Sequence, residues 1–139
     1  MRKFNIGICD DMKEEAENIK NLCEEFFMKS EWNSSFILFS DGEEVLNYDG
    51  ERIDLLFLDI EMKEKDGIEV LRELEHSKIV WKVVFVSRHQ ESVFDAFGIK
   101  TLGFEKKPVK YEKIEKWLKV LIQEHKENFW VECKGLNGK

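Results

Sequence analysis

The chain has 139 residues, of which 42% are hydrophobic and 37% are charged, a composition that fits one compact globular domain and excludes a disordered or collagen-like chain. Its 22 basic and 29 acidic side chains give a formal net charge of −7, which argues against direct binding of nucleic acid by this chain. The three cysteines match no disulfide or zinc spacing, and no signal peptide or membrane span is recognisable, so we expect a cytoplasmic protein that makes no contact with a membrane.

The first half of the chain predicts three strands and two helices between them. Residues 4–9 and 36–39 are short apolar runs typical of strands, and residues 54–58 form a third run that is apolar on both faces, as in a central parallel strand. A helix with Asp11 as its N-cap is predicted after the first run, and residues 40–43 turn into a short second helix. The predicted apolar face of the first helix comprises Met12, Ala16, Ile19, Cys23 and Phe26.

The second half of the chain continues this alternation. Helices are predicted at residues 67–76, at residues 91–97 and from about residue 110, and strands at residues 83–86 and 101–104. Strands that alternate with helices imply right-handed crossovers and a parallel sheet. We therefore predict an α/β fold, a doubly wound (βα)5 sheet with the flavodoxin-like strand order 2-1-3-4-5.

Polar side chains stand at the carboxyl ends of four of these strands. Asp10 and Asp11 follow the first strand, Asp59 the third, Ser87 the fourth, and Lys107 comes shortly after the fifth. Ligands of such sheets bind at this edge, in the crevice where the strand order reverses, which here lies between the first and third strands. Three neighbouring carboxylates repel one another unless a cation joins them, and Mg²⁺ suits carboxylates together with phosphate oxygens. The residues predict a Mg²⁺-dependent pocket in which Asp59 accepts a phosphoryl group.

Each of these residues also has an ordinary structural interpretation when it is taken alone. Asp10 and Asp11 precede a helix, where aspartates often serve as caps. Asp59 is a plausible turn residue, and Lys107 before a proline is typical of a loop. It is their joint placement at successive strand ends that favours a single pocket.

Three motifs resemble the receiver domain of two-component response regulators. Residues 57–62, followed by residues 66–70, resemble the phosphorylation loop of that family, residues 9–11 its acidic pair, and residues 104–108 its lysine–proline element. The resemblance covers about residues 3–122. It implies a receiver domain over residues 1–125 that is phosphorylated by a sensor histidine kinase and is not an enzyme with its own substrate.

The resemblance also implies a role for each matching residue. Asp59 would be the phosphoacceptor and would bind Mg²⁺ together with Asp11 and the backbone carbonyl of Glu61, while Asp10 would act mainly through water. The hydroxyl of Ser87 would bond to the phosphoryl group.

Two further matching residues complete the implied switch. Lys107, and not the adjacent Lys106, would pair with the phosphoryl group. Phe104 would be the switch aromatic residue, moving with the surface of the fourth helix and fifth strand. Homodimerisation on phosphorylation is a further implication of the resemblance.

Within the family, residues 57–62 and 93–97 are most similar to regulators that carry a LytTR-type DNA-binding domain. The expected output is transcription, with DNA bound only through an output domain that this chain lacks. Residues 126–139 fit none of the five strand–helix units and are interpreted as a tail, with residues 128–132 as the truncated first strand of such a domain.

The chain departs from the family pattern at four positions. Lys63 replaces a frequent proline, Arg88 is bulkier than the usual small residue, and Glu61 and His89 stand at positions that vary and modulate phosphoryl lifetime. Two alternatives therefore stay open. One is a pseudo-receiver that only binds a partner protein, and the other is a phosphohydrolase of the haloacid-dehalogenase type, in which Glu61 would be the general acid.

Overall fold

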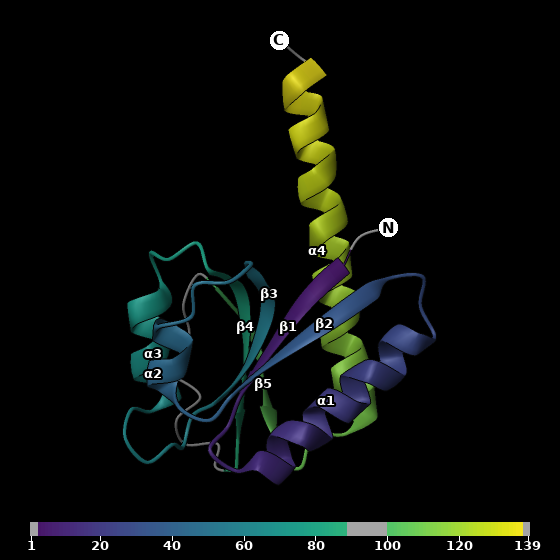
Figure 1. The fold of residues 1–139 in the computed structure, drawn as a ribbon. Helices are drawn as coiled ribbons and strands as arrows, with labels where there is room; N and C mark the ends of the chain where they lie inside the picture. The colour runs from purple at the N-terminus through teal and green to yellow at the C-terminus, as the bar shows by residue number, and fades with distance from the viewer. Residues whose placement is uncertain (1–2, 89–99, 138–139) are drawn as a thin grey trace.

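The computed structural model describes residues 3–88 and 100–137 and shows a parallel sheet between two layers of helices (Figure 1). The strands are β1 (Lys3–Cys9), β2 (Asn33–Phe39), β3 (Ile53–Asp59), β4 (Val80–Ser87) and β5 (Thr101–Lys106). The helices are α1 (Lys13–Met28), α2 (Gly42–Leu46), α3 (Gly67–Leu74) and α4 (Tyr111–Asn137). All strand pairs are parallel and their order is β2-β1-β3-β4-β5, which confirms the predicted fold.

The two faces of the sheet pack against different helices. Helices α1 and α4 cover one face, and α2 and α3 cover the other (Figure 1). Successive side chains of a strand point to opposite faces, so β1 and β3 contribute to both cores. Ile6, Ile8 and Phe57 lie in the core under α1 and α4, whereas Leu56 and Leu58 lie in the core under α2 and α3. This double burial explains why β3 is a continuous apolar run.

The start of α1 differs from the prediction. The residue before the helix is Met12, which supplies no side-chain cap, and the backbone N–H of Met12 instead donates to Oδ1 of Asp10 at 2.8 Å. The predicted cap, Asp11, was therefore wrong. Met12 is also 50% exposed, so its assignment to the apolar face was wrong too, because the helix begins only after it. The other four predicted core residues of α1 are buried.

The C-terminal helix is longer than predicted. The backbone is helical through Asn137, so the prediction of a strand at residues 128–132 was wrong. The only proline of the chain is Pro108, before the helix begins, and no later proline interrupts the helical backbone. Extending an existing helix by one residue requires no new nucleation, and this outweighs the local strand preference of aromatic and β-branched residues.

Three further expectations concern the fourth helix, the cysteines and the membrane. The predicted helix at residues 91–97 lies outside the described residues, as does His89. Cys9 and Cys23 are buried free thiols. Among the described residues, none of the helices has the length and apolar content needed to cross a membrane.

Candidate functional site

The polar residues predicted at the strand ends come together at the carboxyl edge of the sheet. Asp10 directly follows β1, Asp59 and Ser87 are the last residues of β3 and β4, and Lys107 directly follows β5. Parallel pairing of β1 with β3 and of β3 with β4 aligns the first three ends. The backbone N–H of Lys107 donates to the carbonyl of Ser87 at 2.8 Å, which fixes the fourth position beside them.

Three carboxylates form the centre of this site. Asp10, Asp11 and Asp59 each place a carboxylate oxygen within 4.8 Å of the others. Asp10 and Asp59 are each 2% exposed, whereas Asp11 is exposed. This set of hard oxygen donors of one charge, gathered at short range, fits a divalent cation, which would balance the repulsion among them.

The protonation of Asp59 reflects this crowding. Burial raises the pKa of Asp59 to about 7, and the nearby charge of Asp10 adds to the increase. Lys107 and the backbone N–H of Glu61, which donates to Oδ1 of Asp59 at 3.1 Å, act in the opposite direction. Burial likewise raises the pKa of Asp10, although its hydrogen bond from Lys107 opposes this. A bound cation would favour the ionised form of both carboxylates.

Lys107 is the main cation inside the pocket. Its Nζ lies 2.6 Å from Oδ2 of Asp10, 2.5 Å from Oε2 of Glu15 and 3.3 Å from Oδ2 of Asp59. Burial alone would lower the pKa of Lys107, but the hydrogen bonds to Asp10 and Glu15 raise it, so the ammonium stays charged. The adjacent Lys106 is exposed, and so only one of the two lysines lies inside the site.

The side chain of Glu61 takes part in the site in a way that the sequence did not reveal. Its Oε1 accepts a hydrogen bond from the hydroxyl of Ser87 at 2.6 Å and another from the backbone N–H of Arg88 at 3.0 Å. Ser87 is buried. The sequence resemblance named the backbone carbonyl of Glu61 as a metal ligand and its position as a modulator of phosphoryl lifetime. No spacing rule indicates that its carboxylate turns back to the end of β4.

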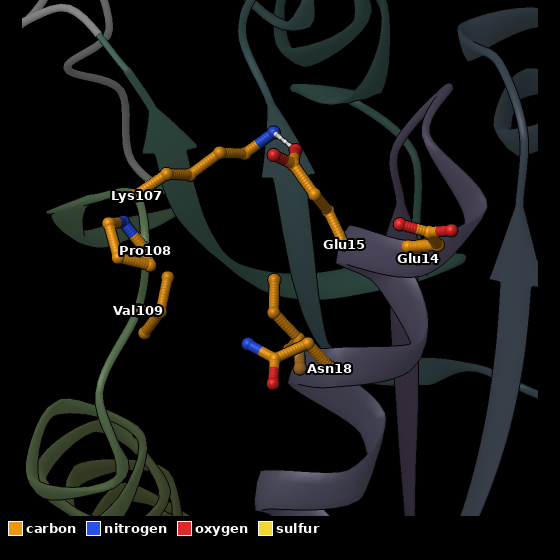
Figure 2. A pocket seen from close by; sticks show the side chains of 7 residues that line it. Glu14, Glu15, Asn18, Lys107, Pro108 and Val109 are labelled. Atoms are coloured by element: carbon orange, nitrogen blue, oxygen red, sulfur yellow. Dashed lines mark hydrogen bonds and ion pairs between the residues drawn. The ribbon is translucent and has the colours of Figure 1, made fainter.

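Sequence reasoning also missed Glu15, on the first turn of α1. A groove of about 200 Å³ lies between α1 and the segment after β5. Figure 2 shows the side chains of Glu15 and Lys107 meeting across it. The second carboxylate oxygen of Glu15 pairs with the guanidinium of Arg88. Burial would raise the pKa of Glu15, but Lys107 and Arg88 outweigh it and lower the pKa. Its position at the start of α1, shortly after Asp10 and Asp11, was the one available signal.

The loop after β3 returns close to the site. The backbone N–H of Gly67 donates to the carbonyl of Ile60 at 3.0 Å. A Cβ atom at Gly67 would lie 2.5 Å from the carbonyl oxygen of Asp59, so the close approach of α3 to the end of β3 requires glycine here. Asp66 caps α3 by accepting from the N–H of Glu69 at 2.9 Å.

Phe104, the predicted switch aromatic residue, lies on β5. It is partly buried and packs against the core under α2 and α3. The centroid of its ring is 6.3 Å from that of Phe85 on β4. The ring therefore lies beside Phe85, which belongs to the same strand as Ser87.

Comparison with known proteins agrees with this geometry. Residues 6–119 match the response regulator receiver domain family. The chain is 35% identical over 81 residues to the positive alginate biosynthesis regulatory protein of Pseudomonas aeruginosa, a match covering 58% of this chain and 33% of that protein. It is 29% identical over 69 residues to the sensory transduction protein LytT of Bacillus subtilis, covering 50% of this chain and 29% of LytT. The chain thus matches only about a third of the length of these relatives.

The fold gives the same result. The solved receiver domain of DrrB activated by BeF3 superimposes with a TM-score of 0.67 and 25% identity, covering 88% of this chain and 99% of that domain. The family match extends over most of the chain and includes the acidic triad, which is typical of the divalent-metal site of receiver domains. The chain belongs to the response regulator receiver domain family and is a signalling phosphoacceptor module of two-component systems.

Proposed function

We propose that Asp59 is the phosphoacceptor of this receiver domain. The observation that carries the proposal is the convergence on Asp59 of two further carboxylates, the ammonium of Lys107 and the hydroxyl of Ser87 at one strand edge. In the reaction, a carboxylate oxygen of Asp59 bonds to phosphorus while the bond between phosphorus and the donor nitrogen or oxygen breaks, which yields an aspartyl phosphate. The phosphoryl oxygens then require the positive charge of Lys107 and a hydrogen bond from Ser87.

The carboxylates of Asp11 and Asp59 and the backbone carbonyl of Glu61 would hold Mg²⁺, with Asp10 acting mainly through water. When bound, Mg²⁺ supplies charge neutralisation for the acceptor and the phosphoryl oxygens. Asp10 keeps a second task within the protein, since it bonds to Lys107 and to the start of α1. Lys107 is thereby held within reach of Asp59 before any phosphoryl group arrives.

The partner that fits this chemistry is a sensor histidine kinase, and we propose that the two proteins meet in the cytoplasm, where the kinase finds its ATP. Output would pass through the surface formed by the fourth helix predicted at residues 91–97 and by β5, with Phe104 moving as Ser87 turns toward the phosphoryl group. We propose transcription as the output, through a LytTR-type domain, with homodimerisation on phosphorylation. Support comes from the relatives, which include LytT and extend well beyond the segment that matches this chain.

The C-terminal boundary of the receiver is part of the same proposal. We place the receiver at residues 1–125 and the tail segment at residues 126–139. The backbone of this segment continues α4 as far as Asn137, so a helical turn of the chain stands where the start of a strand was expected.

Acetyl phosphate and Mg²⁺ test the assignment directly. Incubation followed by intact mass measurement should show an adduct of about 80 Da, the mass of one phosphoryl group. The adduct should be absent in Asp59→Asn and present in Asp49→Asn, a control at an exposed carboxylate. If the wild-type protein forms no adduct, the proposal is wrong and the pseudo-receiver alternative is correct. The family assignment already argues against the phosphohydrolase alternative, because receivers have no substrate of their own.

A further inference from the structure

Glu15 connects the two cations of the site, and the proposed function does not use it. Oε2 of Glu15 accepts from Nζ of Lys107 at 2.5 Å, and Oε1 pairs with the guanidinium of Arg88. The exposed fractions are 21% for the Glu15 side chain and 7% for that of Lys107. One carboxylate on α1 therefore holds groups from the ends of β4 and β5, in a place only partly accessible to water.

Glu15 is a closer partner of Lys107 than the proposed acceptor is. The distance from Nζ of Lys107 to the Glu15 carboxylate is 2.5 Å, against 3.3 Å to the carboxylate of Asp59. A phosphoryl group on Asp59 would carry nearly two negative charges and three acceptor oxygens. It needs the same ammonium, so the phosphoryl group and Glu15 compete for Lys107.

Arg88 is placed to take part in the same exchange. Its backbone N–H lies 3.0 Å from Oε1 of Glu61, so Arg88 begins at the rim of the pocket, directly after Ser87. Its side chain, 56% exposed, extends from the end of β4 to Glu15 on α1. The guanidinium thus lies against Glu15 beside the site in the unphosphorylated protein, and a fork of N–H donors is well suited to phosphoryl oxygens.

We propose that Glu15 is a positioning residue that holds Lys107 and Arg88 in the unphosphorylated protein and releases both to the phosphoryl group on Asp59. This inference rests on the proposed function, because it requires Asp59 to be the acceptor. The negative charge of Glu15 stabilises the unphosphorylated arrangement. It therefore opposes phosphorylation and sets how readily the pocket accepts a phosphoryl group.

The test compares Glu15→Gln with Glu14→Gln in the complete chain. Both variants lose one negative charge from the same helical turn and the same groove, but Glu14 is exposed and in Figure 2 lies apart from the Lys107–Glu15 pair. Phosphorylation by acetyl phosphate with Mg²⁺ is monitored over time by intact mass. Glu15→Gln should form the phosphoprotein roughly three to ten times faster than wild type, the range for loss of one partly exposed charged hydrogen bond. The rate for Glu14→Gln should stay within about twofold of wild type. This allowance covers the weaker repulsion of the anionic acetyl phosphate after loss of one negative charge.

The decay of the phosphoprotein separates competition from simple loosening. If Glu15 only competes with the phosphoryl group, the Glu15→Gln phosphoprotein persists at least as long as that of wild type. Faster decay, or formation no faster than in Glu14→Gln, overturns the inference while leaving Asp59 as the acceptor. Absence of any adduct in the wild-type protein overturns the proposed function instead.

Arg88→Gln tests the second cation independently of any folding defect in the Glu15 variant. If Arg88 moves to the phosphoryl group, its loss should shorten the lifetime of the phosphoprotein about two- to fivefold, as expected for one exposed charge-assisted hydrogen bond. An unchanged lifetime would remove Arg88 from the exchange and overturn that part of the inference.

Discussion

Replacing Asp59 by asparagine should stabilise the metal-free protein. A carboxyl group whose pKa rises from 3.8 to about 7 binds its proton more tightly in the folded state than in the unfolded state. The free energy of unfolding therefore falls as the pH rises from 3.8 to about 7, and the whole of this loss is present above pH 7. At about 1.4 kcal/mol per pH unit, the upper limit of this cost is roughly 4 kcal/mol.

The expected gain is smaller than this limit because Asp59 also contributes to holding Lys107, which lies 3.3 Å away. Lys107 keeps two closer carboxylate partners in the variant. We expect Asp59→Asn to raise the free energy of unfolding by about 2 kcal/mol at pH near 8 in EDTA, and by much less at pH near 5. For a chain of 139 residues this corresponds to an increase in Tm of roughly 6 °C.

Urea unfolding monitored by tryptophan fluorescence gives the free energy, and thermal unfolding gives Tm, with Asp49→Asn as a control at an exposed carboxylate. Saturating Mg²⁺ should stabilise wild type more than Asp59→Asn and so narrow the difference, because a ligand that binds only the folded state adds to its stability. A variant no more stable than wild type at the higher pH, or a difference that is independent of pH, would refute the reasoning about the buried carboxylates.

Three further predictions concern the frame of the site. Gly67→Ala should lower the free energy of unfolding in urea by about 2 kcal/mol, because its Cβ would lie 2.5 Å from the backbone oxygen of Asp59, which cannot give way. The three atoms nearest to a Cβ at Gly50 all belong to the side chain of Tyr48, which can move, so an equal loss in Gly50→Ala would contradict this. Asp66→Ala removes the cap of α3 and should lower stability by about 1 kcal/mol; an unchanged urea midpoint would show that the cap adds nothing. Glu61→Gln weakens the acceptor that holds the hydroxyl of Ser87, so phosphorylation by acetyl phosphate should become about threefold faster, and a slower rate would speak against this role.

The strand ends could be predicted from the sequence because two local signals coincide there. Apolar runs such as residues 54–58 mark buried strands, and a parallel sheet necessarily brings their carboxyl ends to one edge. Asp10, Asp59 and Ser87 each stand at the end of such a run, so topology alone placed them together. No contact between distant side chains had to be inferred.

The contacts of Glu15 and Glu61 could not be predicted in this way. Glu15 and Lys107 are 92 positions apart in sequence, and their meeting depends on how α1 lies against the segment after β5. Ser87 and Glu61 are 26 positions apart, and their bond depends on the side-chain rotamer of Glu61 after the strand has ended. Both depend on tertiary packing, which hydrophobic periodicity does not encode.

The length of α4 has a mechanical consequence for signalling. Its 27 residues span about 40 Å at 1.5 Å per residue, and Figure 1 shows the helix projecting well past the sheet. The helix starts at Tyr111, only a short segment after Lys107, and Ile114 and Leu118 anchor its first turns in the core. Leu121 is also buried, and the ring of His125 packs against Phe4 and Trp32, so the core holds the helix as far as residue 125. Residues 126–137 extend about 18 Å further at 1.5 Å per residue, and a tilt of about 5° would move their far end by roughly 1.6 Å. We therefore expect a repacking of the segment after β5 to be carried outward along the backbone of α4.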